Sequence, residues 1–250
     1  ALDIHRGDRM KTLVAMDTKS VVGKSLVEER TGQPCENFRN GDHTTTLIRT
    51  ENGKVIEIQH DVMTPQPYNR LYQLTGTKGF ANKYPIAGYA LDAKQLNASG
   101  VAPEVDNLNS HSFMPKKDME ALVQKYQHPI LKKYGEMAKE VGGHGGMDFI
   151  MDSRLVYCLQ NGLPLDMDVY DLAEWCCLAE LGELSMDNNC AAVAFPDFTR
   201  GEWNKVKGYK HAYASPEDES VAMEKAKKIT AKLKEKGAVE WAGEAVENKK

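Results

Sequence analysis

Two β-prone runs that flank an Asn-Gly pair constrain the fold of this chain more than any other feature of its sequence. The runs are Thr44–Thr50 and Val55–His60, and Asn52-Gly53 lies between them. An Asn-Gly pair in this position is the strongest short-range signal for a β-hairpin, because these residues readily adopt the backbone conformations of tight turns. In the second run Ile56 and Ile58 fall on the same face, as in a half-buried strand. The chain is therefore expected to contain an antiparallel sheet.

The order of the expected elements indicates an α+β fold. Further strand-like runs, Thr12–Met16 and Leu71–Thr75, lie in the first third of the chain. The second half has apolar residues at helical spacing after a glycine-rich break at 142–146 and again after Asp168. Strands followed by helices favour a mixed, mainly antiparallel open sheet with helices on one face. The buried face of the helix after Asp168 is expected to hold Leu172, Trp175, Cys176 and Ala179.

Composition and motifs narrow the class of protein. With 250 residues, 41% of them hydrophobic, the chain is long enough to bury one large core. A net charge of −4 without a dense basic stripe argues against nucleic-acid binding, and the apolar runs are too short to span a membrane.

The five cysteines show no zinc spacing, so we expect buried small side chains rather than metal ligands or disulfides. No G-x-G-x-x-G turn follows a strand, so no Rossmann domain is expected in this chain.

The charge pattern divides the chain near residue 205. Residues 1–205 are expected to form a sheet-plus-helix domain for substrate binding or oligomerisation, and residues 206–250 a charged helical extension that packs on it or frays. The chain opens without an initiator Met and reads like the middle of a fold, so we expect the gene product to begin upstream. The compartment stays open: the protein is expected to be soluble, and exported or periplasmic if an upstream segment carries a signal.

Four segments carry a resemblance to glycoside hydrolase family 109, a branch of the Gfo/Idh/MocA oxidoreductase fold group. The first is rich in charged residues, the second holds a Pro-Tyr pair, the third surrounds the glycine-rich break, and the fourth follows a short apolar run. They are Leu2–Arg9; Gln59–Arg70 followed by Gly76–Gly79; Gly142–Phe149 with Asn161–Asp171; and Phe195–Gly201. The resemblance implies the C-terminal domain of that family, with an open sheet that pairs with a second copy.

The resemblance also implies a function for the intact protein. Members are similar to α-N-acetylgalactosaminidases that act through bound NAD. Hydride leaves the sugar C3 for NAD⁺, a base removes the C2 proton, the glycosidic bond breaks by elimination, water adds, and NADH returns the hydride. In the family, the cofactor loop and the Tyr-Pro-Thr-His segment with the base lie upstream of the position matching Ala1. The resemblance therefore implies that NAD is bound by an N-terminal domain absent here, and that this fragment alone is inactive.

Three residues are candidates for contact with an N-acetylgalactosaminide. The Pro67-Tyr68 pair matches the position of a sugar-binding tyrosine in the family, and a phenol can both donate and accept a hydrogen bond. Tyr72 is the competing assignment. His144 lies among glycines before a helix, where it either faces a polar ligand or sits exposed in a helix-entry turn. Asp148, in the first turn of that helix, either complements the helix dipole or faces the sugar.

Other polar residues and other functions stay open. Arg70 and Arg200 either clamp a carboxylate or form structural ion pairs, and the second is favoured. A non-catalytic module that mediates homo-oligomerisation through its sheet is the main alternative to a glycosidase domain. The C-terminal domain of a sugar dehydrogenase of the same fold group is another. The sequence assigns no cofactor-binding residue, no metal ligand and no catalytic residue within this chain.

Overall fold

The computed structural model describes residues 2–92, 94–95, 100, 111–160, 162, 165–205, 228 and 231. The chain divides into two compact units. One, called the split unit, combines Ala1–Pro65 with Val141–Lys250, and the other, called the inserted unit, is Gln66–Glu140. Nearly all of the predicted extension at 206–250 lies outside the described residues, so it remains a prediction, as does the single domain at 1–205.

The split unit is built on a four-stranded antiparallel sheet. Its strands are β1 (Met10–Asp17), β2 (Thr44–Thr50), β3 (Val55–His60) and β7 (Val193–Ala194), in the order β3-β2-β1-β7. The predicted hairpin is confirmed as β2 and β3. Its turn is closed by the backbone N–H of Thr50, which donates to the carbonyl of Lys54 at 2.9 Å, and Gly53 supplies the positive φ that the turn needs.

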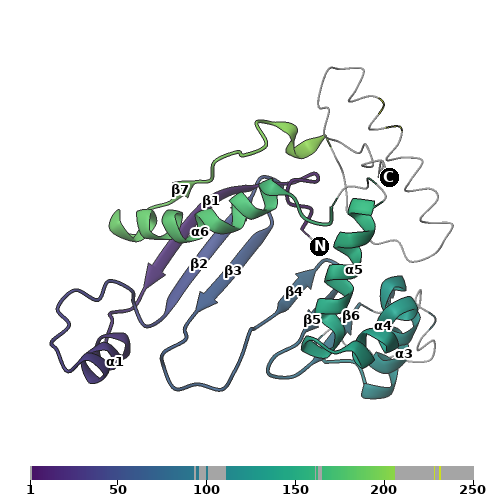
Figure 1. The fold of residues 1–250 in the computed structure, drawn as a ribbon, viewed down its shortest axis with the longest axis horizontal. Coiled ribbons are helices and arrows are strands. Elements are labelled where there is room, and N and C mark those ends of the chain that lie inside the picture. The colour runs from purple at the N-terminus through teal and green to yellow at the C-terminus, as the bar shows by residue number, and fades with distance from the viewer. Residues whose placement is uncertain are drawn as a thin grey trace, which may run out of the picture. The chain divides into compact units, whose positions relative to one another are not determined.

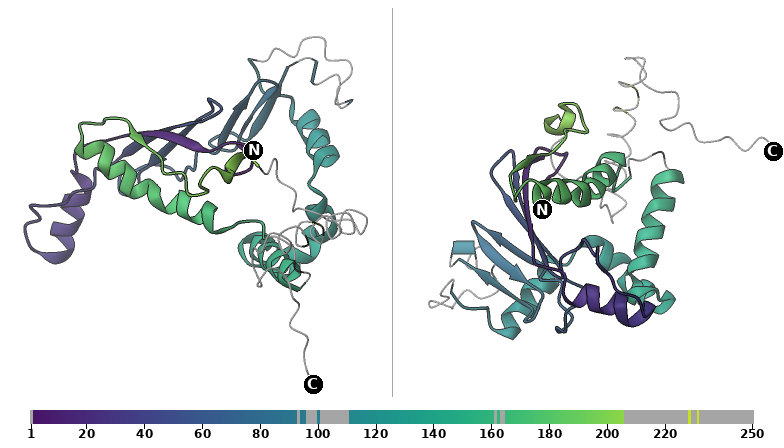
Figure 2. Two further views of the ribbon diagram at one scale, coloured as in Figure 1. Left: turned by 90° about the horizontal axis from the view of Figure 1, so that it is seen from above. Right: turned by 90° about the vertical axis from the view of Figure 1, so that its left-hand side faces the viewer.

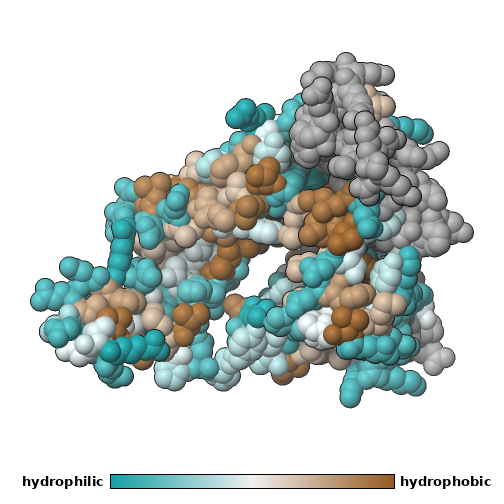
Figure 3. Space-filling model, viewed as in Figure 1, coloured by the Kyte–Doolittle hydropathy of each residue, from teal (hydrophilic) through white to brown (hydrophobic). Residues whose placement is uncertain are grey.

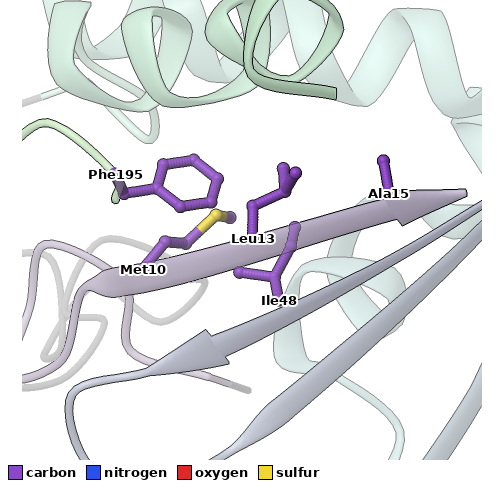
Figure 4. Packing of buried hydrophobic residues seen from close by; sticks show 5 residues of the cluster. All are labelled: Met10, Leu13, Ala15, Ile48 and Phe195. Atoms are coloured by element: carbon purple, nitrogen blue, oxygen red, sulfur yellow. The ribbon is translucent and has the colours of Figure 1, made fainter. Parts of the chain in front are cut away.

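The core of the split unit lies between this sheet and α6 (Val169–Asp187), which runs along one face (Figures 1 and 2). Five buried side chains form its centre: Met10, Leu13, Ala15, Ile48 and Phe195 (Figure 4). Alternation along the strands sends Leu13 and its cross-strand partner Ile48 toward the helix. The helix approaches closely at Gly182, where an added Cβ would lie 3.8 Å from that of Ala15.

The buried face of α6 differs from the expected one. Leu172, Trp175, Cys176 and Ala179 are exposed, Trp175 to 51%, whereas Asp171 and Glu174 are buried. The polar residues turn inward because the segment before β1 brings charged partners against the first turns of the helix. An apolar surface is left over α6 as a result, and it is visible in Figure 3.

The inserted unit has its own small sheet and core. Strands β4 (Gln73–Gly76), β5 (Gly79–Asn82) and β6 (Gly88–Leu91) pair antiparallel in chain order. Met114 is buried against side chains from β6 and from α3 (Lys116–Tyr126), and α4 (Pro129–Val141) follows. The predicted strand at Leu71–Thr75 starts two residues later than expected, because Leu71 and Tyr72 adopt positive φ angles of 54° and 46°.

The predicted α+β class with mainly antiparallel pairing is confirmed, although the strands divide between two sheets. Pro65 and Pro67, which cannot donate to a strand ladder, separate β3 from β4. The remaining described elements are α1 (Val22–Thr31), η1 (His144–Gly146), α5 (Met147–Gln160) and η2 (Glu202–Asn204). Among the described residues, none of the helices combines the length and apolarity that crossing a membrane would require.

Candidate functional site

Tyr68 lies in the segment that leads into β4, and its ring is held from two sides. Its side chain is largely exposed, at 69%. The Tyr84 ring meets it edge to face, with centroids 6.0 Å apart and an interplanar angle of 82°. The Arg70 guanidinium lies over the Tyr68 ring, 5.4 Å from its centroid. The phenol is therefore an exposed hydrogen-bonding group on a ring with a defined orientation.

The backbone around Tyr68 is fixed by short-range bonds and by strain. The N–H of Leu71 donates to Asn69 Oδ1 at 2.6 Å, and the N–H of Lys83 donates to the Tyr72 carbonyl at 3.2 Å. The second bond joins the Tyr68 and Tyr84 segments. Positive φ angles at the bulky residues Leu71 and Tyr72 cost on the order of 1–3 kcal/mol each and persist only where the surroundings impose them.

Tyr72 is less well placed than Tyr68 for a defined contact. Its side chain is exposed, and its carbonyl takes part in the pairing with Lys83. Within the described part of the chain, no ring or cation contact is found for Tyr72 of the kind that holds Tyr68. The geometry therefore favours Tyr68, and its contact with a sugar remains a prediction.

His144 and Asp148 are brought together at the start of α5. His144 Nδ1 lies 2.8 Å from Asp148 Oδ2; the His144 side chain is exposed and that of Asp148 is half-buried. The turn requires glycine at 143, because a Cβ there would lie 2.9 Å from the Asp148 side chain. The Asp148 carboxylate also lies in the first turn of the helix, where it complements the dipole.

The three candidate residues belong to different units. Tyr68 is in the inserted unit, whereas His144 and Asp148 are in the split unit, so each is placed only within its own unit. Their joint contact with one sugar stays a prediction. Neither Arg70 nor Arg200 forms an ion pair with a carboxylate within the described ranges, so the favoured structural role is not found for them.

A buried polar cluster precedes β1, and sequence reasoning did not assemble it. Arg6 donates to both oxygens of Asp171, at 2.9 and 2.8 Å. His5 Nε2 lies 3.4 Å from Glu174 Oε2, and Glu174 Oε1 accepts from the backbone N–H of Met10 at 3.3 Å. The His5-Arg6 pair stands in a recognised motif, but its partners come from more than 160 positions away. The sequence predicts that a helix begins after Asp168, but this pattern does not show that Asp171 and Glu174 meet Arg6 and His5.

The cluster shifts the ionisation of its members. Burial raises the pKa of Asp171, but the hydrogen bonds from Arg6 and from the Asp168 backbone N–H, together with the charges of Arg6 and His5, lower it by more, so the net pKa is lowered. Burial alone would lower the pKa of His5, yet the carboxylates of Glu174, Asp171 and Asp168 raise it above its ordinary value. The predicted helix after Asp168 is confirmed as α6, and Asp168 caps it reciprocally with Asp171.

Comparison with known proteins gives one consistent result. The family model described as the C-terminal domain of glycosyl hydrolase 109 matches residues 1–205. The chain is 84% identical, over its full length, to glycosyl hydrolase family 109 protein 5 of Phocaeicola vulgatus, covering 48% of that protein. It is 61% identical over 85% of its length to a glycosyl hydrolase family 109 protein of Porphyromonas gingivalis, of which it covers 45%.

The chain thus spans about half the length of these relatives. The matched residues contain the four segments that carried the resemblance, including the strained turn at Tyr68 and the polar cluster before β1. The chain belongs to glycosyl hydrolase family 109 and contains that family's C-terminal domain.

Proposed function

We propose that this chain supplies the sugar-binding side of an NAD-dependent glycosidase that acts on α-N-acetylgalactosaminides. The observation that carries the proposal is the Tyr68 ring, which is exposed and yet held by Tyr84 and Arg70. Holding a side chain in its binding orientation lowers the entropy lost when a ligand binds. The phenol then donates to or accepts from a sugar hydroxyl.

The described residues do not fit the pyrophosphate of NAD. A dinucleotide site uses a glycine-rich turn between a parallel strand and a helix, with free backbone donors at the helix start. The strand ladders described here are antiparallel. The glycine-rich turn before α5 has the Asp148 carboxylate at its helix start, which would repel a phosphate. We therefore assign NAD to the half of the relatives' length that this chain does not span, and the resemblance implies the same place for the catalytic base.

The proposal is tested with the full-length protein and a neutral aryl α-N-acetylgalactosaminide. Release of free N-acetylgalactosamine is followed together with absorbance of NADH. A glycosidase that restores its cofactor in each turnover releases sugar without net NADH. Accumulation of NADH in proportion to consumed sugar would instead identify a dehydrogenase. No reaction with any galactosaminide would overturn the proposed substrate.

A second function, pairing of two copies through the larger sheet, is supported by the face opposite α6. The strand alternation that buries Leu13 and Ile48 turns Leu47 outward, and Val55 on β3 is also exposed. Leu47 is 46% exposed and Val55 66%. Across the strands Leu47 is paired with Glu57 and Val55 with Arg49, so apolar and charged side chains alternate on this face, as they do on many interaction surfaces. We propose that this face joins two copies of the protein, alongside the catalytic role.

A further inference from the structure

Two cations lie on the tyrosine pair of the inserted unit. Arg70 lies over the ring of Tyr68, and Lys83 Nζ lies 5.6 Å from the ring centroid of Tyr84. The two ring centroids are 6.0 Å apart. Both cationic side chains are exposed. Tyr68, Arg70, Lys83 and Tyr84 are called the tyrosine–cation ledge below.

The ledge is built from two segments that are tied together. The Lys83 N–H bonds to the Tyr72 carbonyl, and Asn82 Nδ2 donates to the Ile86 carbonyl at 2.9 Å across the turn that carries Tyr84. The strained backbone at Leu71 and Tyr72 follows Arg70 directly. The backbone therefore holds Arg70 and Lys83 on two joined segments, each within reach of a tyrosine ring.

The charges of the ledge are not neutralised by any carboxylate that the structure describes in the inserted unit. Exposed lysines and arginines commonly pair with a nearby carboxylate, as Lys116 does with Glu120 in the same unit. Among the described residues of the inserted unit, neither Arg70 nor Lys83 has a carboxylate within ion-pair distance. Each instead rests on an aromatic ring, where the positive charge stays available to a ligand.

We propose that Arg70, Lys83 and Tyr84 extend the Tyr68 site into a subsite for an anionic substituent, a sulfate ester or a carboxylate, on the substrate. This inference rests on the proposed function, because Tyr68 orients the sugar ring that carries the substituent. The Arg70 guanidinium has the planar fork that bonds an anion through two parallel hydrogen bonds, and Lys83 adds a point charge.

The test uses the full-length protein and three methyl α-glycosides of N-acetylgalactosamine. One is neutral, one carries a 6-sulfate, and one carries sialic acid at O6, so the last two separate a sulfate from a carboxylate. Affinities are measured by calorimetry at low and at high salt. We expect one anionic glycoside to bind more tightly than the neutral one, with an advantage that falls as salt screens the charges.

Variants that remove the charges of Arg70 and Lys83 test whether the tighter binding of the anionic glycoside depends on the ledge. In the double variant Arg70→Gln/Lys83→Gln, the ratio of anionic to neutral affinity should fall by about two- to fivefold for each cation, as for other exposed charge pairs. Lys78→Gln is the matched control, because Lys78 is an exposed lysine of the same unit without a described ring contact. It should leave the ratio unchanged.

The outcomes separate this inference from the function on which it rests. Equal affinity for neutral and anionic glycosides, with the neutral one cleaved, would overturn the subsite and leave the glycosidase intact. A preference that survives the double variant would place the anion elsewhere. Inorganic sulfate competing as well as the sulfated sugar would show a general anion contact and overturn a substrate subsite. Failure of all three glycosides to bind would overturn both proposals.

Discussion

Tyr68 owes its orientation to contacts from separate parts of the inserted unit. Tyr68→Phe removes the phenol oxygen while keeping the ring that meets Tyr84 and Arg70. A neutral hydrogen bond is worth about 0.5–1.5 kcal/mol, so we expect kcat/KM of the full-length protein to fall about two- to tenfold. Bound NAD and the melting temperature should not change.

Tyr72→Phe is the matched control for this prediction. It should have little effect, because Tyr72 lacks the ring contacts found for Tyr68 in the described part of the chain. A defect in Tyr72→Phe with none in Tyr68→Phe would show that the motif had been placed four residues too early. A loss of about a thousandfold or more in Tyr68→Phe would mean that the phenol transfers a proton.

His5 gives the split unit a dependence on pH. Its folded-state pKa is raised by the carboxylates of Glu174, Asp171 and Asp168, against the opposing effect of burial. A group with a raised pKa contributes stability that is complete below its unfolded pKa of about 6.5 and is lost as pH rises through the folded value. Replacing His5 with Gln should therefore cost more stability in mildly acidic than in mildly alkaline buffer.

Urea unfolding gives the unfolding free energies of wild type and His5→Gln at about pH 5.5 and about pH 8.5. The difference between the two proteins at each pH isolates His5, because the other titrating groups are common to both. An equal difference at both values would contradict the prediction, because it would show that His5 has the same pKa in the folded and in the unfolded protein.

A site residue could be predicted where a local sequence motif identifies it, and was missed where its contacts come from a distant part of the chain. Tyr68 could be singled out because a local motif places it after a proline. Tyr84 could not, because it reaches Tyr68 only through the pairing of Lys83 with Tyr72. Glu174 is absent from the expected buried face of α6 for a similar reason, since its partners lie before β1.

At the scale of elements, Asp8 fastens the β2–β3 hairpin to the start of β1. Its buried carboxylate accepts from the Thr50 hydroxyl at 2.8 Å and from the backbone N–H of Asn52 at 3.0 Å, and Lys54 Nζ lies 3.2 Å away. Asp8→Ala leaves these donors without their acceptor. A buried donor left unsatisfied costs about 1–3 kcal/mol, so we expect a loss of about 3 kcal/mol in unfolding free energy.

Chemical denaturation measures this loss, with Asp8→Asn as the control, because the amide keeps one acceptor oxygen and should lose less. Equal stability of Asp8→Ala and wild type would mean that the hydrogen bonds to Asp8 do not stabilise the packing of the hairpin against the start of β1.

Element types were more predictable than element faces. The hairpin follows from a local turn signal and alternation, both of which lie within a few residues. The face of α6 was predicted wrongly because hydrophobicity ranks Trp175 above Glu174, whereas the segment before β1 supplies partners that make the carboxylates the buried residues. The hydrophobic periodicity of a helix cannot show which polar partners a distant segment of the chain places against that helix.

At the scale of the whole molecule, the outward sheet face predicts association. Leu47→Glu should convert a dimer or larger oligomer of the full-length protein into smaller species, because it would replace an apolar contact with a second carboxylate directly opposite Glu57. Light scattering across a concentration series measures the change, and Lys78→Gln should keep the wild-type mass. A monomeric wild type at high concentration would contradict pairing through this face.

NAD binding should also distinguish the chain from the longer protein. Because the described residues do not fit a pyrophosphate, we expect calorimetry to detect no micromolar binding of NAD to residues 1–250 alone. The full-length protein should bind it. Micromolar binding by the 250-residue chain would overturn the assignment of the cofactor to the other half.

The division of the chain into a split unit and an inserted unit has a consequence for the order of folding during synthesis. The inserted unit ends at Glu140, whereas the larger sheet still awaits α6 and its edge strand β7, which come later in the chain. Because domains fold as they emerge from the ribosome, the inserted unit can be complete while β1, β2 and β3 still lack their covering helix. Strands β1, β2 and β3 therefore stay uncovered until about 50 residues beyond Glu140 have been made. During that time their apolar side chains are open to aggregation, so we expect chaperones to bind the nascent chain.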